Sequence, residues 1–433
     1  MDHKINNVCV IGLGYVGLTL AVTLAERGLI VFGVEKNEKI LRELKKGKSH
    51  FHEKGLNELI AKTKGKTLLL SKNIPSDAKI DCFIIAVSTP IDPKTKLPRI
   101  DYIESATQEI APHLKPGQLV VLRSTIPVGV TRNVVLPILQ KQCQEFYLSF
   151  CPERTAEGKA LEELKTLPQV VGGLDEASTD ASVELFSKIS PLIVRTSSLE
   201  AAEIVKLVNN SYRDMVFAYA NQIALICKSL GLNAKDVIDA ANLGYPRSDI
   251  KLPGIVGGFC LEKDPYILMT SSKYDTSLIR AAKELNANII HHIVDSVKKH
   301  LKKRSLKNAK VFISGFAFKG QPETDDLRSS QAIKLLELLK KQKVKNILGH
   351  DFIVPKAEIK NLGVIPVSIE KGLQQADIAI FMNNHKAYAD VDMEKLAKKM
   401  KKGSMIFDGW HLFSEQLKSH GHINYESIGF KKS

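Results

Sequence analysis

The stretch VCVIGLGYVGL, residues 8–18, decides the fold class of this chain. An apolar run typical of a buried strand leads into the pattern G-x-G-x-x-G made by Gly12, Gly14 and Gly17, which then opens a helical run. Glycines at these positions permit a tight turn and let the backbone approach a pyrophosphate at the positive end of the helix. Strand, glycine turn and helix in this order predict a dinucleotide site, with a turn made only for packing as the alternative.

The acidic residue after the next apolar run indicates which dinucleotide binds. Residues 30–34 form that run, and Glu35 follows it, 18 residues after Gly17. A carboxylate at this point can hold the adenosine ribose hydroxyls and repel a 2′-phosphate. The sequence therefore favours NAD over NADP, and the adjacent Lys36 is the one feature that weakens this discrimination.

The same region has the apolar length of a membrane segment. Residues 8–25 carry no charge, which is just long enough for a membrane span or the core of a signal peptide. However, the segment contains three glycines within a stretch of six residues, and each glycine in a helix interior lowers the stability of the helix by about 1 kcal/mol. We therefore expect neither a membrane span nor an export signal.

Composition narrows the class of protein further. The 433 residues are 44% hydrophobic and 25% charged, as in ordinary soluble globular proteins. The six cysteines form no C-x-x-C pair, which argues against a disulfide scaffold and a zinc module and favours the reducing cytoplasm. The twelve histidines contain no H-E-x-x-H pattern, so we expect no metal site.

The formal net charge of +15 raises the question of an acidic partner. Lysine clusters lie at residues 298–310, 340–345 and 398–402. Such clusters are mostly solvated faces, with an anionic ligand or nucleic acid as the alternative. Since no helix-turn-helix, zinc-finger, RRM or KH signature is present, we expect no nucleic-acid partner.

The hydropathy pattern predicts an α/β protein with two Rossmann-like, doubly wound parallel-sheet domains joined by a central helical region. Strand-like runs at 8–12, 30–34, 82–86 and 119–122 alternate with helical patterns. One long helix is expected from Leu199 to about Leu230, and a second helical stretch from Thr276 to Leu301. The long helix carries an apolar stripe whose members recur every three or four residues: Ile204, Val208, Tyr212, Met215, Tyr219, Ile223, Ile226 and Leu230. A new α/β alternation begins at Lys310, with strands expected at 311–315, 344–348, 378–381 and 405–408 and a helix at 329–341. The predicted domains are residues 1–198, 199–305 and 306–433.

Cys260 differs from the other cysteines in its surroundings. Cys9 and Cys82 fall in strand patterns and Cys227 in the long helix, where an inert buried thiol is expected. Cys260 follows a glycine-rich segment, residues 254–258, and precedes a lysine and an aspartate. A polar loop of this kind can lower the pKa of a thiol and make it a nucleophile. Spacing alone leaves the nucleophile and the structural thiol as equal alternatives.

Two further segments carry polar groups at suggestive spacings. Lys206, Asn210 and Arg213 share one face of the long helix, either as a solvated stripe or as donors that stabilise an oxyanion. Residues 315–320, GFAFKG, follow a strand and precede Arg328, which is compatible with a diphosphate site but is not a P-loop.

The ordered set of motifs resembles the UDP-glucose/GDP-mannose dehydrogenase family over nearly the whole chain. The motifs that carry the resemblance are VCVIGLGYVGL (8–18), AVSTP (86–90), STIPVGVT (124–131), CPERTAEGKAL (151–161), EIVKLVNNSYRD (203–214), GGFCLEKDP (257–265), FAFKG (316–320) and DDLRSS (325–330). The resemblance implies a homodimer, built through the long helix, that oxidises a UDP-sugar primary alcohol to a carboxylate and reduces two NAD.

The resemblance also implies roles for individual residues. The expected catalytic residues are the nucleophile Cys260, the oxyanion donors Lys206 and Asn210, the water-positioning Asp264 and Thr125, and Glu153 in acid–base work or hydrolysis. The expected NAD contacts are Gly12, Gly14, Tyr15, Val16, Gly17, Glu35, Thr89, Ser124, Thr125, Glu157 and Arg328. The expected UDP-sugar contacts are Glu153, Arg154, Lys206, Asn210, Arg213, Arg247, Gly254, Gly257, Gly258 and Lys319.

Within the family, the residues after Pro152, the Arg213-Asp214 pair and Arg247 resemble the branch that acts on UDP-N-acetylhexosamines. Two departures stand against this: Phe259 lies where that branch commonly has histidine, and Trp410 lies near the place of a substrate-binding arginine. UDP-glucose 6-dehydrogenase is the first alternative. A non-catalytic nucleotide-sugar-binding protein is the second.

Overall fold

A computed structural model of the chain describes residues 4–301, 308–417 and 421–431. The chain forms two compact units, the first made of residues up to Asn210 together with Lys263–Asp275 and the second of Ser211–Glu262 together with the chain from Thr276 onward. Two helices, α8 (Leu199–Ser229) and α10 (Phe259–Thr270), contribute residues to both units.

Eight strands form the sheet of the first unit among the residues described, in the order β3-β2-β1-β4-β5-β6-β7-β8. The strands are β1 (Asn7–Ile11), β2 (Ile30–Val34), β3 (Leu68–Ser71), β4 (Cys82–Ile85), β5 (Leu119–Leu122), β6 (Tyr147–Phe150), β7 (Gln169–Gly173) and β8 (Ile193–Arg195). All neighbouring pairs are parallel except β6 with β7. The order starts from β1 and winds outward in both directions, as in a doubly wound sheet.

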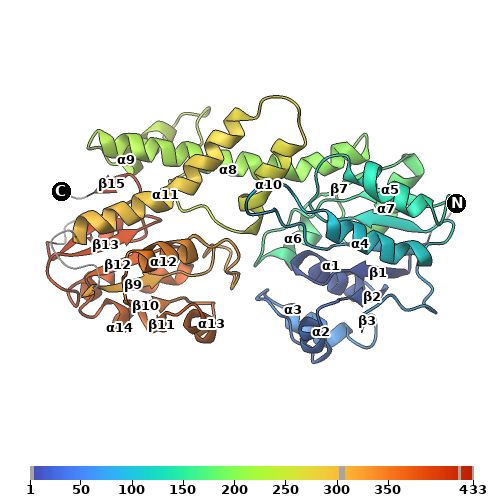
Figure 1. Cartoon of the computed structure of the whole chain (residues 1–433), viewed down its shortest axis with the longest axis horizontal. Helices are drawn as coiled ribbons and strands as arrows, with labels where there is room; N and C mark the ends of the chain where they lie inside the picture. The colour runs from blue at the N-terminus through green and yellow to red at the C-terminus, as the bar shows by residue number, and fades with distance from the viewer. Residues whose placement is uncertain (1–3, 302–307, 418–420, 432–433) are drawn as a thin grey trace. The chain divides into compact units, whose positions relative to one another are not determined.

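Helices cover both faces of this sheet (Figure 1). They are α1 (Tyr15–Glu26), α2 (Glu38–Lys45), α3 (Leu56–Thr63), α4 (Asp101–Ile110), α5 (Leu136–Gln140), α6 (Ala160–Thr166) and α7 (Glu176–Ser187). Alternate residues of β1 point to the two faces: Val8 and Val10 pack with α1, while Cys9 and Ile11 pack with α4. The strands are buried on both faces, which explains their continuous apolar runs.

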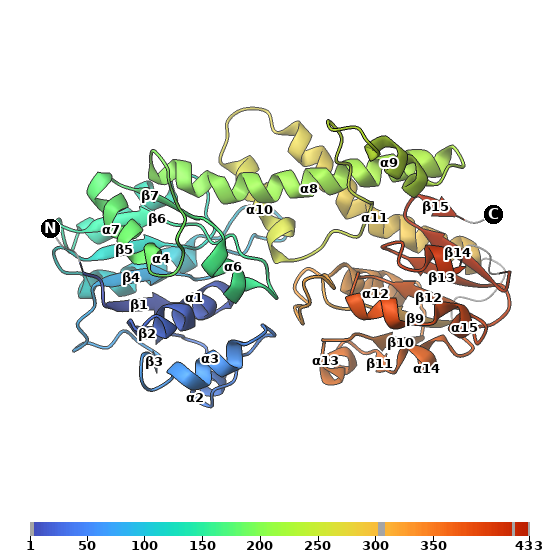
Figure 2. The same cartoon turned by 180° about the vertical axis from the view of Figure 1, so that it is seen from behind.

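The second unit holds a seven-stranded sheet within the described residues, in the order β11-β10-β9-β12-β13-β14-β15. Its strands are β9 (Lys310–Ser314), β10 (Asn346–His350), β11 (Ile365–Pro366), β12 (Ile378–Phe381), β13 (Ser404–Asp408), β14 (Ile423–Ser427) and the antiparallel β15 (Phe430–Lys431). Its further helices among the residues described are α9 (Ala234–Asn242), α11 (Ser277–Leu301), α12 (Gln331–Lys341), α13 (Lys356–Asn361), α14 (Ile369–Leu373), α15 (Met393–Ala397) and α16 (Ser414–Leu417). Figure 2 shows α9 and α11 to α15 from behind.

The predicted fold class is confirmed, with small differences at element ends. The strand predicted at 344–348 is β10, two residues later in the chain. The helix predicted from Ser329 begins at Gln331, because the side chain of Ser330 caps it by accepting from the backbone N–H of Ala332. Of the predicted basic segment 298–310, residues 302–307 lie outside the described residues.

The long helix differs from expectation in which face it buries. Its predicted apolar stripe is largely exposed, at Ile204, Val208, Tyr212, Tyr219 and Ile226. No helix of the described residues combines the length and apolar character needed to cross a membrane.

Candidate active site

The glycine turn after β1 has the geometry of a pyrophosphate-binding loop. Gly12 has φ +90°, and a Cβ there would lie 3.0 Å from the carbonyl oxygen of Ala86. A Cβ on Gly17 would lie only 1.8 Å from the carbonyl oxygen of Gly12. Gly14, by contrast, has no protein atom of the described residues within 4 Å of such a Cβ, and it is the N-cap of α1. The turn is therefore tight beneath and open at the helix N-terminus, which fits a dinucleotide pyrophosphate.

Glu35 lies beside this turn at the end of β2. Its Oε2 accepts from the backbone N–H of Leu13 at 3.0 Å, and its Oε1 accepts from that of Asn37 at 2.8 Å. Lys36 is turned to other partners, since its Nζ forms an ion pair with Glu109 at 2.7 Å. The carboxylate is thus held at the glycine loop with lone pairs left for ribose hydroxyls, and the neighbouring cation is already paired.

Two further loops of this unit follow β4 and β5. The Ser124 hydroxyl donates to the backbone oxygen of Val87 at 2.7 Å and so ties the loops together. Thr89 is buried and Thr125 is half-buried beside them. Glu203, a buried residue of α8, accepts from the backbone N–H groups of Gly129 and of Thr131. These contacts join the loop after β5 to the loop after β4 at Ser124 and to α8 at Gly129 and Thr131.

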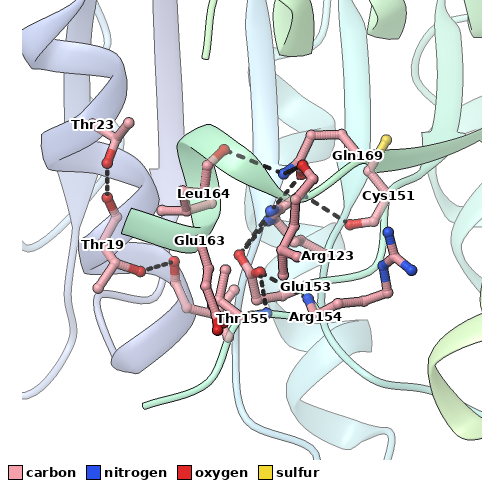
Figure 3. A network of polar contacts seen from close by, with 12 residues as sticks. Thr19, Thr23, Arg123, Cys151, Glu153, Arg154, Thr155, Glu163, Leu164 and Gln169 are labelled. Atoms are coloured by element: carbon pink, nitrogen blue, oxygen red, sulfur yellow. Dashed lines mark hydrogen bonds and ion pairs between the residues drawn. The ribbon is translucent and has the colours of Figure 1, made fainter. Parts of the chain in front are cut away.

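Glu153 lies at the centre of a buried polar network (Figure 3). Its Oε2 accepts from Arg123 at 2.7 Å, and its Oε1 accepts from the backbone N–H groups of Arg154 and Thr155 at 2.8 and 2.9 Å. Burial raises the pKa of Glu153, but Arg123, the Thr155 N–H and Lys206 outweigh it, so the pKa lies below its usual value. Glu153 is therefore an ionised carboxylate within the electrostatic reach of Lys206.

Helices α8 and α10 bring together further predicted residues within the first unit. The Asn210 Nδ2 donates to Asp264 Oδ2 at 2.6 Å. The Lys263 Nζ donates to Asp264 Oδ1 at 2.7 Å, and the Asp264 side chain is fully buried. Lys206 lies one helical turn before Asn210 and is half-buried. The structure thus places Glu153, Lys206, Asn210 and Asp264 in one polar cluster of this unit.

Cys260 is the second residue of α10 and lies one helical turn before Asp264. None of the six cysteines, all of which lie among the described residues, forms a disulfide bond, and Cys260 alone among them is partly exposed. Burial raises the pKa of the Cys9 and Cys151 thiols to about 12 and makes them inert at neutral pH. The first turn of a helix, where Cys260 lies, stabilises negative charge on a sulfur or on an adjacent oxygen.

The glycine segment before Cys260 is built into the second unit by close contacts. A Cβ on Gly254 would lie 2.6 Å from the Trp410 ring, and one on Gly258 would lie 2.5 Å from the Phe318 ring. Gly257 is similarly close, with its Cβ position 3.0 Å from the backbone oxygen of Ser329. Only glycine fits this path at Gly258, whose φ is +97°.

The turn after β9 parallels the glycine turn of the first unit. Gly315 has φ +91°, and Asp351, just after β10, accepts from the backbone N–H groups of Phe316 and Ala317 at 2.7 and 3.0 Å. Lys319, two residues further on, is half-buried. This arrangement keeps a fixed backbone turn beside a basic side chain, as an anion site requires.

The remaining predicted residues lie outside these clusters. Arg328 is exposed, bonds both carboxylate oxygens of Asp326 at 2.7 to 2.9 Å, and lies over the Phe259 ring. Arg213 is exposed on α8, and Arg247 is exposed and stacked on Tyr245.

Tyr15 stacks on Phe51 and donates its hydroxyl to the backbone oxygen of His52. Val16 and Glu157 are half-buried residues of the first unit. Among the residues described, no three His, Cys, Asp or Glu side chains are grouped to hold a metal ion.

Sequence reasoning missed three residues that hold the site in place. Arg123 binds Glu153, Glu203 binds the loop after β5, and Asn221 binds the glycine segment. A signal existed for two of them: Glu203, Asn210 and Asn221 are 7 and 11 residues apart and therefore share one face of α8. For Arg123 the signal is a charged residue directly after a continuous apolar strand.

Three family models match successive parts of the chain. They are the NAD binding domain (residues 6–190), the central domain (200–288) and the UDP binding domain (312–415) of the UDP-glucose/GDP-mannose dehydrogenase family. Together they account for most of the chain.

Known relatives match it nearly end to end. A UDP-N-acetyl-D-mannosamine dehydrogenase of Campylobacter jejuni is 32% identical over 409 residues, which cover 91% of this chain and 99% of that protein. An NDP-N-acetyl-D-galactosaminuronic acid dehydrogenase of Ralstonia nicotianae is 32% identical over 92% of this chain and 96% of its own length. The solved structure of the UDP-D-ManNAc dehydrogenase from Pyrococcus horikoshii superposes with a TM-score of 0.87 at 30% identity and covers 98% of this chain and 99% of that one.

Proposed function

Because this chain belongs to the UDP-glucose/GDP-mannose dehydrogenase family and is an NAD-dependent nucleotide-sugar dehydrogenase, we propose that it oxidises the 6-hydroxyl of a UDP-N-acetylhexosamine to the carboxylate. The single observation that carries the proposal is the cluster of Lys206, Asn210 and Asp264, one helical turn from the partly exposed Cys260. A binding protein has no use for a nucleophile at that place.

The proposed cofactor contacts follow from the geometry of the first unit. When bound, NAD accepts the hydride in each of the two oxidations. The glycine turn with Tyr15 and Val16 would receive the pyrophosphate at the start of α1, and Glu35 would hold the ribose hydroxyls. Further proposed contacts are Thr89, Ser124, Thr125, Glu157 and Arg328.

Cys260 is the proposed nucleophile between the two oxidations. Its sulfur adds to the carbon of the aldehyde made first, and the carbonyl oxygen takes up a proton to give a thiohemiacetal. The second oxidation removes a hydride from that carbon and a proton from that oxygen, leaving a thioester. Water then attacks the thioester, the carbon–sulfur bond breaks, and the carboxylate and the free thiol are released.

The polar cluster of the first unit would supply the charges that these steps need. Lys206 and Asn210 are the proposed donors to the oxygen that becomes negative. Asp264, held by Asn210 and Lys263, is the proposed acceptor that positions water together with Thr125. Glu153 assists acid–base chemistry or hydrolysis. The proposed UDP-sugar contacts are Glu153, Arg154, Lys206, Asn210, Arg213, Arg247, Gly254, Gly257, Gly258 and Lys319.

The choice of an N-acetylated sugar is supported by the names of the relatives, which act on UDP-N-acetyl-D-mannosamine or carry N-acetyl-D-galactosaminuronic acid in their name. The product would serve as a precursor of a surface polysaccharide. UDP-glucose remains the alternative substrate, because Phe259 and Trp410 depart from the N-acetylhexosamine branch.

NADH formation with a panel of UDP-sugars tests the proposal. We expect two NADH per molecule of one UDP-N-acetylhexosamine and none with UDP-glucose. Turnover of UDP-glucose alone would support the proposed oxidation but contradict the assignment to the UDP-N-acetylhexosamine branch. The absence of turnover with every sugar would favour a binding protein.

The covalent step is tested separately by Cys260→Ser, with Cys227→Ser, a buried thiol of α8, as the matched control. We expect Cys260→Ser to bind NAD and UDP-sugar but to lose formation of the acid, while Cys227→Ser keeps it. Undiminished steady-state activity of Cys260→Ser would contradict the covalent mechanism.

Three broader expectations accompany the proposal. We propose functional domains at residues 1–198, 199–305 and 306–433, for NAD binding, for dimerisation with catalysis, and for UDP-sugar binding. We propose a homodimer that binds neither membrane nor nucleic acid. We propose the cytoplasm as its location, because its free thiols and its substrates suit that compartment.

A further inference from the structure

Arg123 is a buried cation at a position that the proposed chemistry does not use. It directly follows β5, and its side chain is 0% exposed. A guanidinium removed from water in this way is stable only when its donors are matched by acceptors. The acceptors around Arg123 therefore indicate the role of its charge.

The partners of Arg123 lie in the first unit, on segments far apart in the sequence (Figure 3). The Nε and one terminal nitrogen donate to Glu153 Oε2 at 3.2 and 2.7 Å. The same terminal nitrogen donates to Gln169 Oε1 at 3.0 Å, and the other donates to the backbone oxygen of Cys151 at 3.3 Å. The guanidinium carbon also lies 5.0 Å from the centre of the Phe186 ring. The cation is thus fixed on all sides.

The carboxylate of Glu153 is correspondingly occupied. Arg123 donates to one oxygen, and the backbone N–H groups of Arg154 and Thr155 donate to the other. An acid that delivered a proton to the substrate would have to break these bonds in each turnover. A carboxylate that only supplied negative charge would keep them.

We infer that Arg123 is a positioning residue: it keeps Glu153 ionised and immobile, so that Glu153 fixes the 153–155 turn and faces the Lys206 charge without exchanging a proton during turnover. This inference rests on the proposed function and narrows the role of Glu153 to electrostatic support of Lys206.

The charged groups around Glu153 are consistent with this assignment. Arg123 after β5 and Lys206 on α8 both favour its ionised form. The Arg154 guanidinium is turned to the backbone oxygen of Pro168, and Glu163 on α6 accepts from the backbone N–H of Ala156. Without Arg123, burial would dominate, and the pKa of Glu153 would rise.

The pH profile of kcat tests the inference. In the wild type we expect no limb that belongs to Glu153 between about pH 5.5 and pH 9, because a carboxyl group with a lowered pKa titrates below that range. Arg123→Met should lower kcat about tenfold or more at pH 7 and add a new pH-dependent limb. Arg123→Lys, which keeps the charge, should recover part of kcat and lack that limb.

Two further variants make the result specific. In Arg123→Met/Glu153→Gln the new limb should disappear, because its titrating group is gone. Arg195→Met removes an exposed arginine that pairs with Asp180 in the same unit, and it should leave kcat and the pH profile unchanged. A wild-type limb that Glu153→Gln abolishes would overturn the inference, as would a wild-type profile for Arg123→Met.

An activity-independent readout separates this inference from the proposed function. Infrared difference spectra of Arg123→Met against Arg123→Met/Glu153→Gln should show a protonated carboxyl at neutral pH. If no UDP-sugar is turned over, this spectrum still tests the Arg123–Glu153 relation. If Arg123→Met does not fold, the kcat of Arg123→Lys and the pH profile of Glu153→Gln decide the matter.

Discussion

At the scale of single residues, the three glycines of the first turn do different things. Gly17 is required by the fold, because its Cβ position lies 1.8 Å from the backbone oxygen of Gly12. Gly14 has open space around its Cβ position, so the fold does not require a glycine there. Its role is then best explained by the ligand that fills the space.

This difference predicts opposite behaviour of two alanine variants. Gly17→Ala should destabilise the protein by about 3 kcal/mol, since backbone must move to admit the methyl group. Gly14→Ala should keep the melting temperature but raise KM for NAD at least tenfold, because the methyl group occupies the approach of the pyrophosphate. Thermal unfolding and NAD titration measure both. Equal losses of stability would contradict the assignment.

Glu35 allows its charge to be tested apart from its shape. Glu35→Gln keeps an acceptor for the Leu13 N–H and for a ribose hydroxyl but loses the negative charge. We expect KM for NADP to fall about tenfold, equivalent to about 1.4 kcal/mol, while KM for NAD changes about twofold. Lys36→Gln is the matched control, because Lys36 is paired with Glu109. An unchanged NAD/NADP ratio in Glu35→Gln would show that discrimination lies elsewhere.

At the scale of elements, α8 buries a row of polar side chains and leaves most of its predicted apolar stripe exposed. Glu203, Asn210, Asp214 and Asn221 are all buried, and their spacing returns to within about 20° of one direction around the helix. Each of them meets a backbone or side-chain partner in its own unit, as Asn286 does for Asp214. Helix α8 is therefore the element that holds the backbone at Gly129, Thr131 and Gly254 in place.

Asn221 shows most clearly how a buried polar residue of α8 holds a neighbouring segment in place. Its amide accepts from the Gly254 N–H at 3.0 Å and donates to the Gly254 oxygen at 3.1 Å. Asn221→Leu should lower stability by about 2 kcal/mol, because it leaves two buried backbone groups unpaired. We also expect KM for the UDP-sugar to rise about tenfold with KM for NAD unchanged. Asn209→Ala, on the exposed side of the same helix, should change neither constant.

The sequence predicted the positions of helices and strands better than it predicted which of their faces are buried and which side chains contact one another. The apolar runs at 30–34 and 119–122 coincide with β2 and β5, because strands buried on both faces have a clear pattern. The orientation of α8 was not predictable from its apolar stripe, since periodicity does not say which face meets the core. Arg123 was missed because its partners Glu153 and Gln169 lie 30 and 46 residues away.

At the scale of the whole molecule, the exposed apolar face of α8 needs a partner. Tyr212 is 66% exposed and Tyr219 56%, and Ile204, Val208 and Ile226 continue the same stripe. An apolar stripe of this length at the surface of a protein marks an interaction surface. A second copy of the chain presents the same stripe, so two copies related by a two-fold axis can cover each other.

We therefore expect a homodimer that depends on this stripe. Tyr212→Asp combined with Tyr219→Asp places charges in the interface, where they would be desolvated without partners, and should shift the mass measured by light scattering from dimer to monomer. Tyr102→Asp, an exposed aromatic of α4, is the control and should remain dimeric. If the double variant stays dimeric, the interface lies elsewhere, and if the wild type is monomeric, the stripe binds a different partner. Since α8 also carries Lys206 and Asn210, loss of the dimer should lower kcat while each monomer stays folded.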